Sequence, residues 1–223
     1  MIKESILSAM SSDVITVNEA ASLFDIYERG GITRDSKHRM DIYEYFKDAT
    51  VEAAHLKFES YEDKALSAKA NEDVKYSENM EAVAKKFVAD CDEIRNKLIA
   101  QKKKLISVAK SDPNAFMDDI KLTDEGMDKN LPENASFGGD CGKTQSLAIS
   151  AAESFGKLLV KCSSRGCKKL TSKCASYAHS CMYDVDDMAY VILEFIRRGD
   201  KGLPDPDKNT WRNGKEPEYK FEF

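Results

Sequence analysis

Residues 77 to 110 place an apolar side chain at every third or fourth position for about four heptads, which is the pattern of a long amphipathic helix. Ser77 can cap this helix, and Glu78 and Glu81 favour its first turn electrostatically. At 1.5 Å per residue such a helix is about 50 Å long. The repeat consists of Met80, Val83, Phe87, Cys91, Ile94, Leu98, Gln101, Leu105 and Val108, in which Gln101 is the polar exception.

A second segment of similar length precedes this repeat. Residues 34 to 69 contain no glycine and no proline, and apolar residues recur at Ile42, Phe46 and Leu56. The break at residues 71 to 76 is short, so the two helices must run antiparallel. The sequence therefore predicts a long α-hairpin, similar to a coiled coil, over residues 33–111.

The rest of the chain divides by composition into four further segments. Five prolines and eleven glycines in 223 residues are few, so we expect an all-α fold in which a second helical unit and an extended C-terminal tail follow the hairpin. The predicted segments are short N-terminal helices at 1–32, an acidic, glycine-containing linker at 112–143, a cysteine-rich helical unit at 144–199, and a tail at 200–223. The linker should contain a short helix near 115–121.

Local signals refine two of these segments. Asn18 can cap a short helix that Gly30 and Gly31 would end. Within the cysteine-rich unit, Gly156 and Gly166 are candidate breaks.

The net charge of −5 argues against a nucleic-acid-binding protein. Residues 112–140 carry eight acidic residues and two lysines, a balance of −6, whereas residues 143–173 carry six lysines, one arginine and one glutamate, a balance of +6. Adjacent stretches of opposite sign are typical of mutual neutralisation or of two solvated faces. A basic helix that faces phosphate or a membrane surface is the alternative.

No apolar stretch predicts a secretory signal or a membrane span. We therefore expect the protein to be cytoplasmic when made, with reduced cysteines, and we keep later incorporation into a virion as a possibility.

Six cysteines are the most unusual part of the composition. Cys167, Cys174 and Cys181 are seven residues apart, and Cys162 lies just upstream. On a continuous helix they share one face but are spaced by about 10.5 Å, too far for one zinc ion or for a disulfide within the row. We expect no metal or cofactor. Packing in a core and disulfide cross-links to Cys91, to Cys141 or between subunits remain the open interpretations.

The glycine-rich run at 138–144, Gly-Gly-Asp-Cys-Gly-Lys-Thr, is similar to the end of a phosphate-binding loop. The spacing between its glycines is one residue too short, and no apolar strand precedes it. We therefore interpret it as a turn into a helix capped by Thr144, which could still attract an adventitious anion.

Titratable residues form no catalytic constellation in the sequence. His38 and His55 fall on the first long helix, and His179 lies between two cysteines without a suitable geometry for nucleophilic catalysis. Asp184 and Asp187 could share a divalent cation across one helical turn, but we interpret the acidic run at 184–187 as the favourable start of an apolar helix. We expect a protein that is not an enzyme.

The C-terminal tail ends in alternating aromatic and charged residues. Extended aromatic arms often dock on a partner, although such an arm can also pack back on its own domain. The candidate docking residues are Trp211, Tyr219, Phe221 and Phe223.

Two functional hypotheses follow from these features. The first is a structural or assembly protein whose long hairpin and tail contact copies of itself or other proteins, with a virus or phage particle as one setting, because a narrow hairpin usually needs further helices to bury its seam. The second is a thiol-based switch or regulator, using disulfides or a metal, centred on the region from Cys162 to Cys181.

Overall fold

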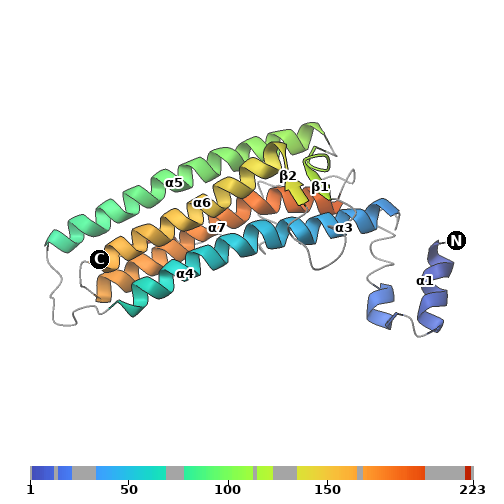
Figure 1. Ribbon diagram of the computed structural model, residues 1–223, viewed down its shortest axis with the longest axis horizontal. Coiled ribbons are helices and arrows are strands. Elements are labelled where there is room, and N and C mark those ends of the chain that lie inside the picture. The colour runs from blue at the N-terminus through green and yellow to red at the C-terminus, as the bar shows by residue number, and fades with distance from the viewer. Residues whose placement is uncertain are drawn as a thin grey trace.

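The computed structural model describes residues 2–12, 15–21, 34–68, 78–112, 115–122, 135–164, 168–198 and 219–221. Long helices lie side by side in an elongated bundle, which confirms the predicted all-α fold (Figure 1). The bundle consists of α3 (Arg34–Lys47), a π-helical turn η1 (Asp48–Glu52) and α4 (Ala53–Ser67) in one continuous run, followed by α5 (Glu78–Ser111), α6 (Gly139–Ser163) and α7 (Lys168–Arg198).

Successive long helices alternate in direction along the bundle (Figure 1). The α3–α4 run and α5 are the antiparallel arms of the predicted hairpin, but each arm packs mainly against the second helical unit, α4 on α6 and α5 on α7. Gln145 and Glu153 of α6 bond to Ala49 and Tyr61, so α6 follows the direction of the first arm. The seam of each arm is thus covered by helices from the same chain.

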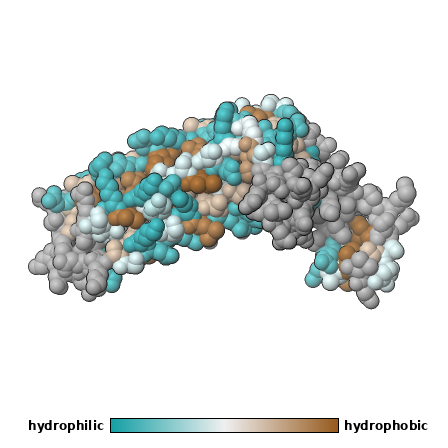
Figure 2. Space-filling model, in the orientation of Figure 1, coloured by the Kyte–Doolittle hydropathy of each residue, from teal (hydrophilic) through white to brown (hydrophobic). Residues whose placement is uncertain are grey.

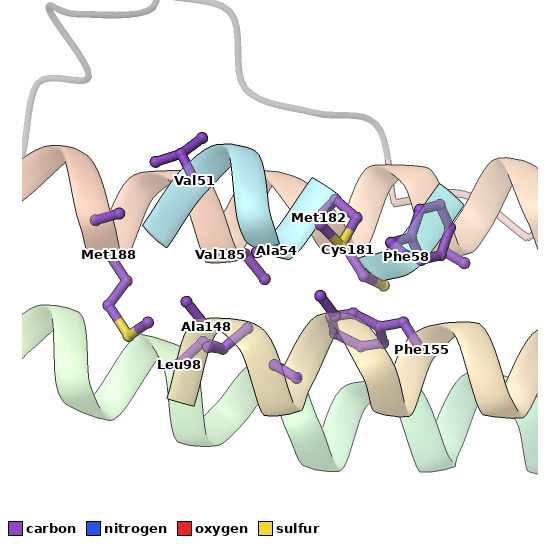
Figure 3. Close-up of a cluster of buried hydrophobic side chains, with 14 of the residues drawn as sticks. Val51, Ala54, Phe58, Leu98, Ala148, Phe155, Cys181, Met182, Val185 and Met188 are labelled. Atoms are coloured by element: carbon purple, nitrogen blue, oxygen red, sulfur yellow. The ribbon is translucent and has the colours of Figure 1, made fainter. Parts of the chain in front are cut away.

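The heptad pattern of α5 correctly predicts its buried face. Phe87, Cys91, Leu98 and Leu105 are buried in one core that all four helical runs share. Figure 3 shows Leu98 facing residues of the other helices across this core. Because the apolar face of each helix is matched by its neighbours, hydrophobic burial stabilises the bundle as a unit.

The structure describes one of the two candidate glycine breaks, Gly156. Gly156 lies inside α6 and does not interrupt the helix. A side chain at this position would place its Cβ 2.5 Å from the Cβ of Tyr61. The close approach of α4 and α6 therefore requires glycine at this position. The helix does end at Ser163 and restarts at Lys168, so the cysteine-rich unit is a pair of antiparallel helices. Gly166 itself lies outside the described residues.

The π-helical turn η1 lies where the first arm meets α6. The side-chain amide of Gln145 donates to the carbonyl oxygen of Ala49 over 3.2 Å. Such turns widen the helix and release carbonyl groups from their usual partners, and a neighbouring helix can then bind them. The hydroxyl of Thr50 is fully buried beside it without a hydrogen-bond partner among the described residues.

The connection between α5 and α6 departs from the sequence prediction. The short helix expected near 115–121 is wrong, because residues 115–119 form a turn that leads into strand β1 (Ile120–Leu122). Strand β2 (Ala135–Phe137) pairs with β1 in antiparallel register, Ile120 opposite Phe137. This two-stranded sheet sets the position of the first turn of α6.

The N-terminal region begins with α1 (Ile2–Ser11), which stands apart from the bundle in Figure 1. Residues 17–21 are helical, but the cap is not Asn18. Thr16 and Glu19 form a reciprocal capping box, with Thr16 N to Glu19 Oε2 at 2.7 Å and Glu19 N to Thr16 Oγ1 at 3.2 Å. The predicted stop at Gly30 and Gly31, the break at 71–76 and the cap Ser77 fall outside the described residues.

Figure 2 shows one face of the molecule, where hydrophilic residues dominate and hydrophobic ones are interspersed along the bundle. No described helix is both long and apolar enough to cross a membrane.

Candidate functional site

The described C-terminal residues, Tyr219 to Phe221, lie on α5 and α7. The ring of Tyr219 covers the guanidinium group of Arg95, with 3.5 Å between the guanidinium carbon and the ring centroid. The Tyr219 hydroxyl donates to Asp184 Oδ2 over 2.9 Å. Tyr219 therefore joins the tail to both helices through one cation–π contact and one charge-assisted hydrogen bond.

Arg95 is held in place by two carboxylates that belong to the helices. Its Nε donates to Asp184 Oδ2 over 2.7 Å, and one of its terminal nitrogens donates to Asp92 Oδ1 over 2.8 Å. The hydroxyl of Tyr177 also donates to Asp92 Oδ1, over 2.8 Å. We call the group formed by Asp92, Arg95, Tyr177 and Asp184 the tail-docking site.

The second aromatic residue of the tail packs on Tyr177. The rings of Phe221 and Tyr177 meet edge to face, with centroids 6.0 Å apart. On α5, Phe87 makes a similar contact to Tyr177 at 6.5 Å. Tyr177 thus links the tail to the core, and the tail-docking site combines a polar half at Arg95 with an aromatic half at Tyr177.

The electrostatics of this site favour binding over proton transfer. Burial and the neighbouring Asp184 carboxylate raise the pKa of Tyr219, and burial with the hydrogen bond to Asp92 raises the pKa of Tyr177. Burial alone would lower the pKa of Arg95, but hydrogen bonds to Asp184 and Asp92 raise it. The phenols therefore remain donors and the guanidinium remains charged at neutral pH.

The acidic run of α7 connects that helix to two neighbours. Since α7 begins at Lys168, the run lies in the middle of the helix and not at its N-terminus, as the sequence interpretation assumed. Asp184 pairs with Arg95 of α5, Asp186 Oδ1 lies 2.7 Å from His55 Nε2 of α4, and Asp187 pairs with Lys102 of α5 at 3.4 Å. Each of these carboxylates has its own partner and acts as a tie between helices.

The cysteines meet in pairs across helices. Cys181 of α7 shares a hydrogen bond with Cys91 of α5, and Cys174 of α7 shares one with Cys162 of α6. These hydrogen bonds, together with burial, raise the pKa values of Cys91 and Cys174. The seven-residue spacing separates the two α7 thiols by about 10.5 Å along the helix, so each of them can meet a cysteine of a different helix.

None of the described cysteines forms a disulfide. All five cysteines that the structure describes are free and buried, and none is at disulfide-bonding distance from another. Cys141 lies apart from the two pairs, where its thiol is 3.9 Å from the carbonyl oxygen of Phe116 and burial raises its pKa. Cys167 lies outside the described residues. In the described part of the chain, no three histidine, cysteine or acidic residues are placed to hold a metal ion.

His179 contacts α4. Its Nε2 is 2.8 Å from Glu62 Oε1 of α4, and its ring packs against Phe58. The side chain of His38 is not among those described.

The glycine-rich turn is closed by the chain's own carboxylate. Asp119 Oδ2 accepts hydrogen bonds from the backbone nitrogens of Asp140 at 2.9 Å and Cys141 at 3.2 Å, in the first turn of α6. An anion at this helix N-terminus would compete with Asp119. The predicted cap Thr144 is wrong, because α6 already begins at Gly139 and Thr144 is buried, bonded to Gln101.

A groove of about 240 Å³ lies between the first half of α5 and the end of α6. Val83 and Leu158 contribute to its wall. Two of its charged residues, Lys86 and Asp90, form an ion pair with each other at 3.0 Å, so they largely neutralise one another.

Of the candidate docking residues, the structure places Tyr219 and Phe221 together on α5 and α7, whereas Trp211 and Phe223 lie outside the described residues. The receiving residues Asp92, Arg95 and Tyr177 were missed by sequence reasoning. Their only sequence signal is the presence of charged and polar side chains beside the apolar seam, and that signal does not reveal which helices meet.

Comparisons with family models, with curated proteins and with solved structures found no match to this chain.

Proposed function

We propose that this chain is a non-enzymatic helical protein that works in structure or assembly, through homo- or hetero-oligomeric contacts. The supporting observation is the tail-docking site, which binds a short aromatic segment of its own chain by stacking, a hydrogen bond and edge-to-face packing. These are the contacts by which proteins recognise linear segments of other chains. A subunit of a virus or phage particle is one member of this class.

The N-terminal region supports the same proposal. Ile6 and Ala20 are buried, yet they do not belong to the core that the bundle helices share. Leu7 and Val17 remain 47% and 70% exposed. A short helical unit that stands apart from the bundle and exposes apolar side chains is suited to binding another protein surface.

The test is the native mass of the full chain, measured by light scattering after size exclusion at rising concentration. Self-assembly predicts species heavier than the 25.0 kDa monomer, with a fraction that grows with concentration. A mass of 25.0 kDa at every concentration would contradict self-association.

The thiol switch is the alternative proposal, and the two interhelical cysteine pairs favour it. In each pair, a peroxide or a small disulfide would accept two electrons as the two thiols lose their protons and form one disulfide. The buried, protonated thiols would need local opening first. Counting free thiols before and after oxidant, with a metal assay, tests this proposal. Six free thiols and no metal after exposure would contradict it.

A further inference from the structure

We propose that the tail-docking site also accepts the C-terminal segment of a second copy of this chain, so that chains associate by exchanging Tyr219 to Phe221. This inference rests on the proposed function and names its partner. It concerns a surface on α5 and α7 that four side chains define, Asp92, Arg95, Tyr177 and Asp184.

The receiving surface is organised by contacts that do not involve the tail. Arg95 is fixed by Asp184 and Asp92, and Asp92 is fixed in turn by Tyr177. Phe87 supports the Tyr177 ring from the core. A site whose donors and acceptors are already oriented loses little entropy on binding, so it can receive an incoming segment without reorganisation.

The contacts of the segment are made by side chains that any copy could supply. The Tyr219 ring stacks over Arg95, its hydroxyl donates to Asp184, and Phe221 packs on Tyr177. The same three contacts form whether the segment comes from the same chain or from a neighbour. This equivalence is the general basis of segment exchange between identical subunits.

The length of the connection permits exchange. Twenty residues, 199 to 218, join the end of α7 to Tyr219. Asp184 and Tyr177 lie 14 and 21 residues before Arg198, hence about 21 and 32 Å back along the helix. Twenty extended residues span up to about 66 Å, roughly twice that distance. The connection therefore has enough length to reach a site on an adjacent molecule.

Docking within one chain and docking between chains compete. A tethered segment is present at its own site at an effective concentration in the millimolar range, which favours the internal contact in dilute protein. Exchange is then favoured where copies are crowded together, as they are in an assembly. Two variants that cannot dock internally remove this competition and isolate the exchange.

The experiment mixes two full-length variants. The first, Tyr219→Ser with Phe221→Ser, keeps the site but loses the segment. The second, Arg95→Met with Asp184→Asn, keeps the segment but loses the site, and it leaves neither charge of that pair buried alone. Circular dichroism and thermal melting establish that each variant is folded before mixing. Sedimentation velocity then follows each variant alone and the equimolar mixture.

The proposal predicts a one-to-one complex in the mixture and monomers in each separate sample. A synthetic peptide of residues 216 to 223 should dissociate the complex. Replacing the first variant by Tyr219→Ala with Phe221→Ala should leave the affinity of the complex unchanged, because that chain supplies the site and not the docking segment. Adding Tyr219→Phe to the second variant should instead weaken the complex about tenfold, because the donated segment then lacks its hydroxyl.

The absence of a complex from the mixture at several hundred micromolar would overturn the exchange. Self-association of the first variant alone, to the same extent as the wild type, would also overturn it, because the contact would then lie elsewhere. That second result would leave the proposed assembly function standing, so the two failures are distinguishable.

Discussion

The ring of Tyr219 covers the guanidinium group of Arg95, 3.5 Å from its carbon atom, although the two residues belong to opposite halves of the chain. This contact places the C-terminal segment on α5, where two carboxylates already hold the arginine. The tail is therefore bound through a polar network that spans α5 and α7, and changes in that network should be measurable as changes in stability.

Replacing Tyr219 tests the contribution of its hydroxyl and its ring separately. Tyr219→Phe removes the hydrogen bond to Asp184 and should lower the free energy of unfolding by about 1 kcal/mol. Tyr219→Ala also removes the ring over Arg95 and should cost more. Urea denaturation followed by circular dichroism measures both. Equal stability of the alanine variant and the wild type would show that the segment does not dock in solution.

Arg95→Met should be among the more destabilising changes outside the apolar core. It leaves Asp184 largely buried without its cation, which typically costs about 3 kcal/mol, whereas the double variant Arg95→Met with Asp184→Asn should recover much of that loss. Lys97→Ala is the matched control on the same helix, because it removes an exposed ion pair to Glu93 and should cost less than about 0.5 kcal/mol. A single variant no worse than this control would contradict the network.

The sequence was sufficient to predict the helices but not their neighbours. The heptad seam of α5 and the breaker-free first arm follow from local periodicity, and both are present. That α4 packs on α6, and α5 on α7, depends on tertiary register, which periodicity does not contain. The same limit applies to the site. The sequence identifies Tyr219 as a candidate docking residue because it is an aromatic residue in an extended tail. Arg95 is identified as its partner only by the packing of α5 on α7.

The cysteine row shows how one break in a helix changes an interpretation. A continuous helix would separate Cys162 from Cys174, but the reversal after Ser163 brings Cys162 to Cys174 across two helices. The glycine-rich turn shows a different limit, because its short spacing excluded a phosphate-binding loop but gave no sign that Asp119 would occupy the helix N-terminus.

Stability should depend on pH through His55, which ties α4 to α7. The hydrogen bond to Asp186 raises the pKa of His55 in the folded state, so protonated His55 stabilises the fold. This stabilisation is fully present below the unfolded pKa of about 6.5 and is lost as the pH rises through the higher folded pKa.

His55→Gln should therefore reduce the fall in unfolding free energy on the alkaline side of about pH 6.5. Denaturation curves at a series of pH values measure the slope for both proteins. Asp186→Asn is the matched variant from the other helix and should flatten the same region. Identical slopes in the wild type and both variants would contradict the assignment to this pair.

Two adjacent glycines at the start of α6 offer a matched pair of substitutions. Gly139 has φ +46°, and a Cβ there would lie 2.0 Å from Asp119 Oδ1, so Gly139→Ala both strains the backbone and displaces the cap. We expect it to cost about 2 kcal/mol in unfolding free energy. Gly138→Ala brings its Cβ no closer than 3.5 Å to Asp119 O and should be nearly neutral. Similar melting temperatures for the two variants would show that Asp119 does not cap α6.

Photo-cross-linking from position 221 identifies where the C-terminal segment docks and on which chain. A photoreactive phenylalanine analogue at Phe221 preserves the aromatic contact with Tyr177, and mass spectrometry identifies where it inserts. A mixture of isotopically heavy and light chains separates products within one chain from products between chains. We expect insertion into α5 and α7 around Phe87 and Tyr177, with heavy–light products that increase with concentration. Insertion elsewhere on the bundle, or no reproducible insertion, would contradict it.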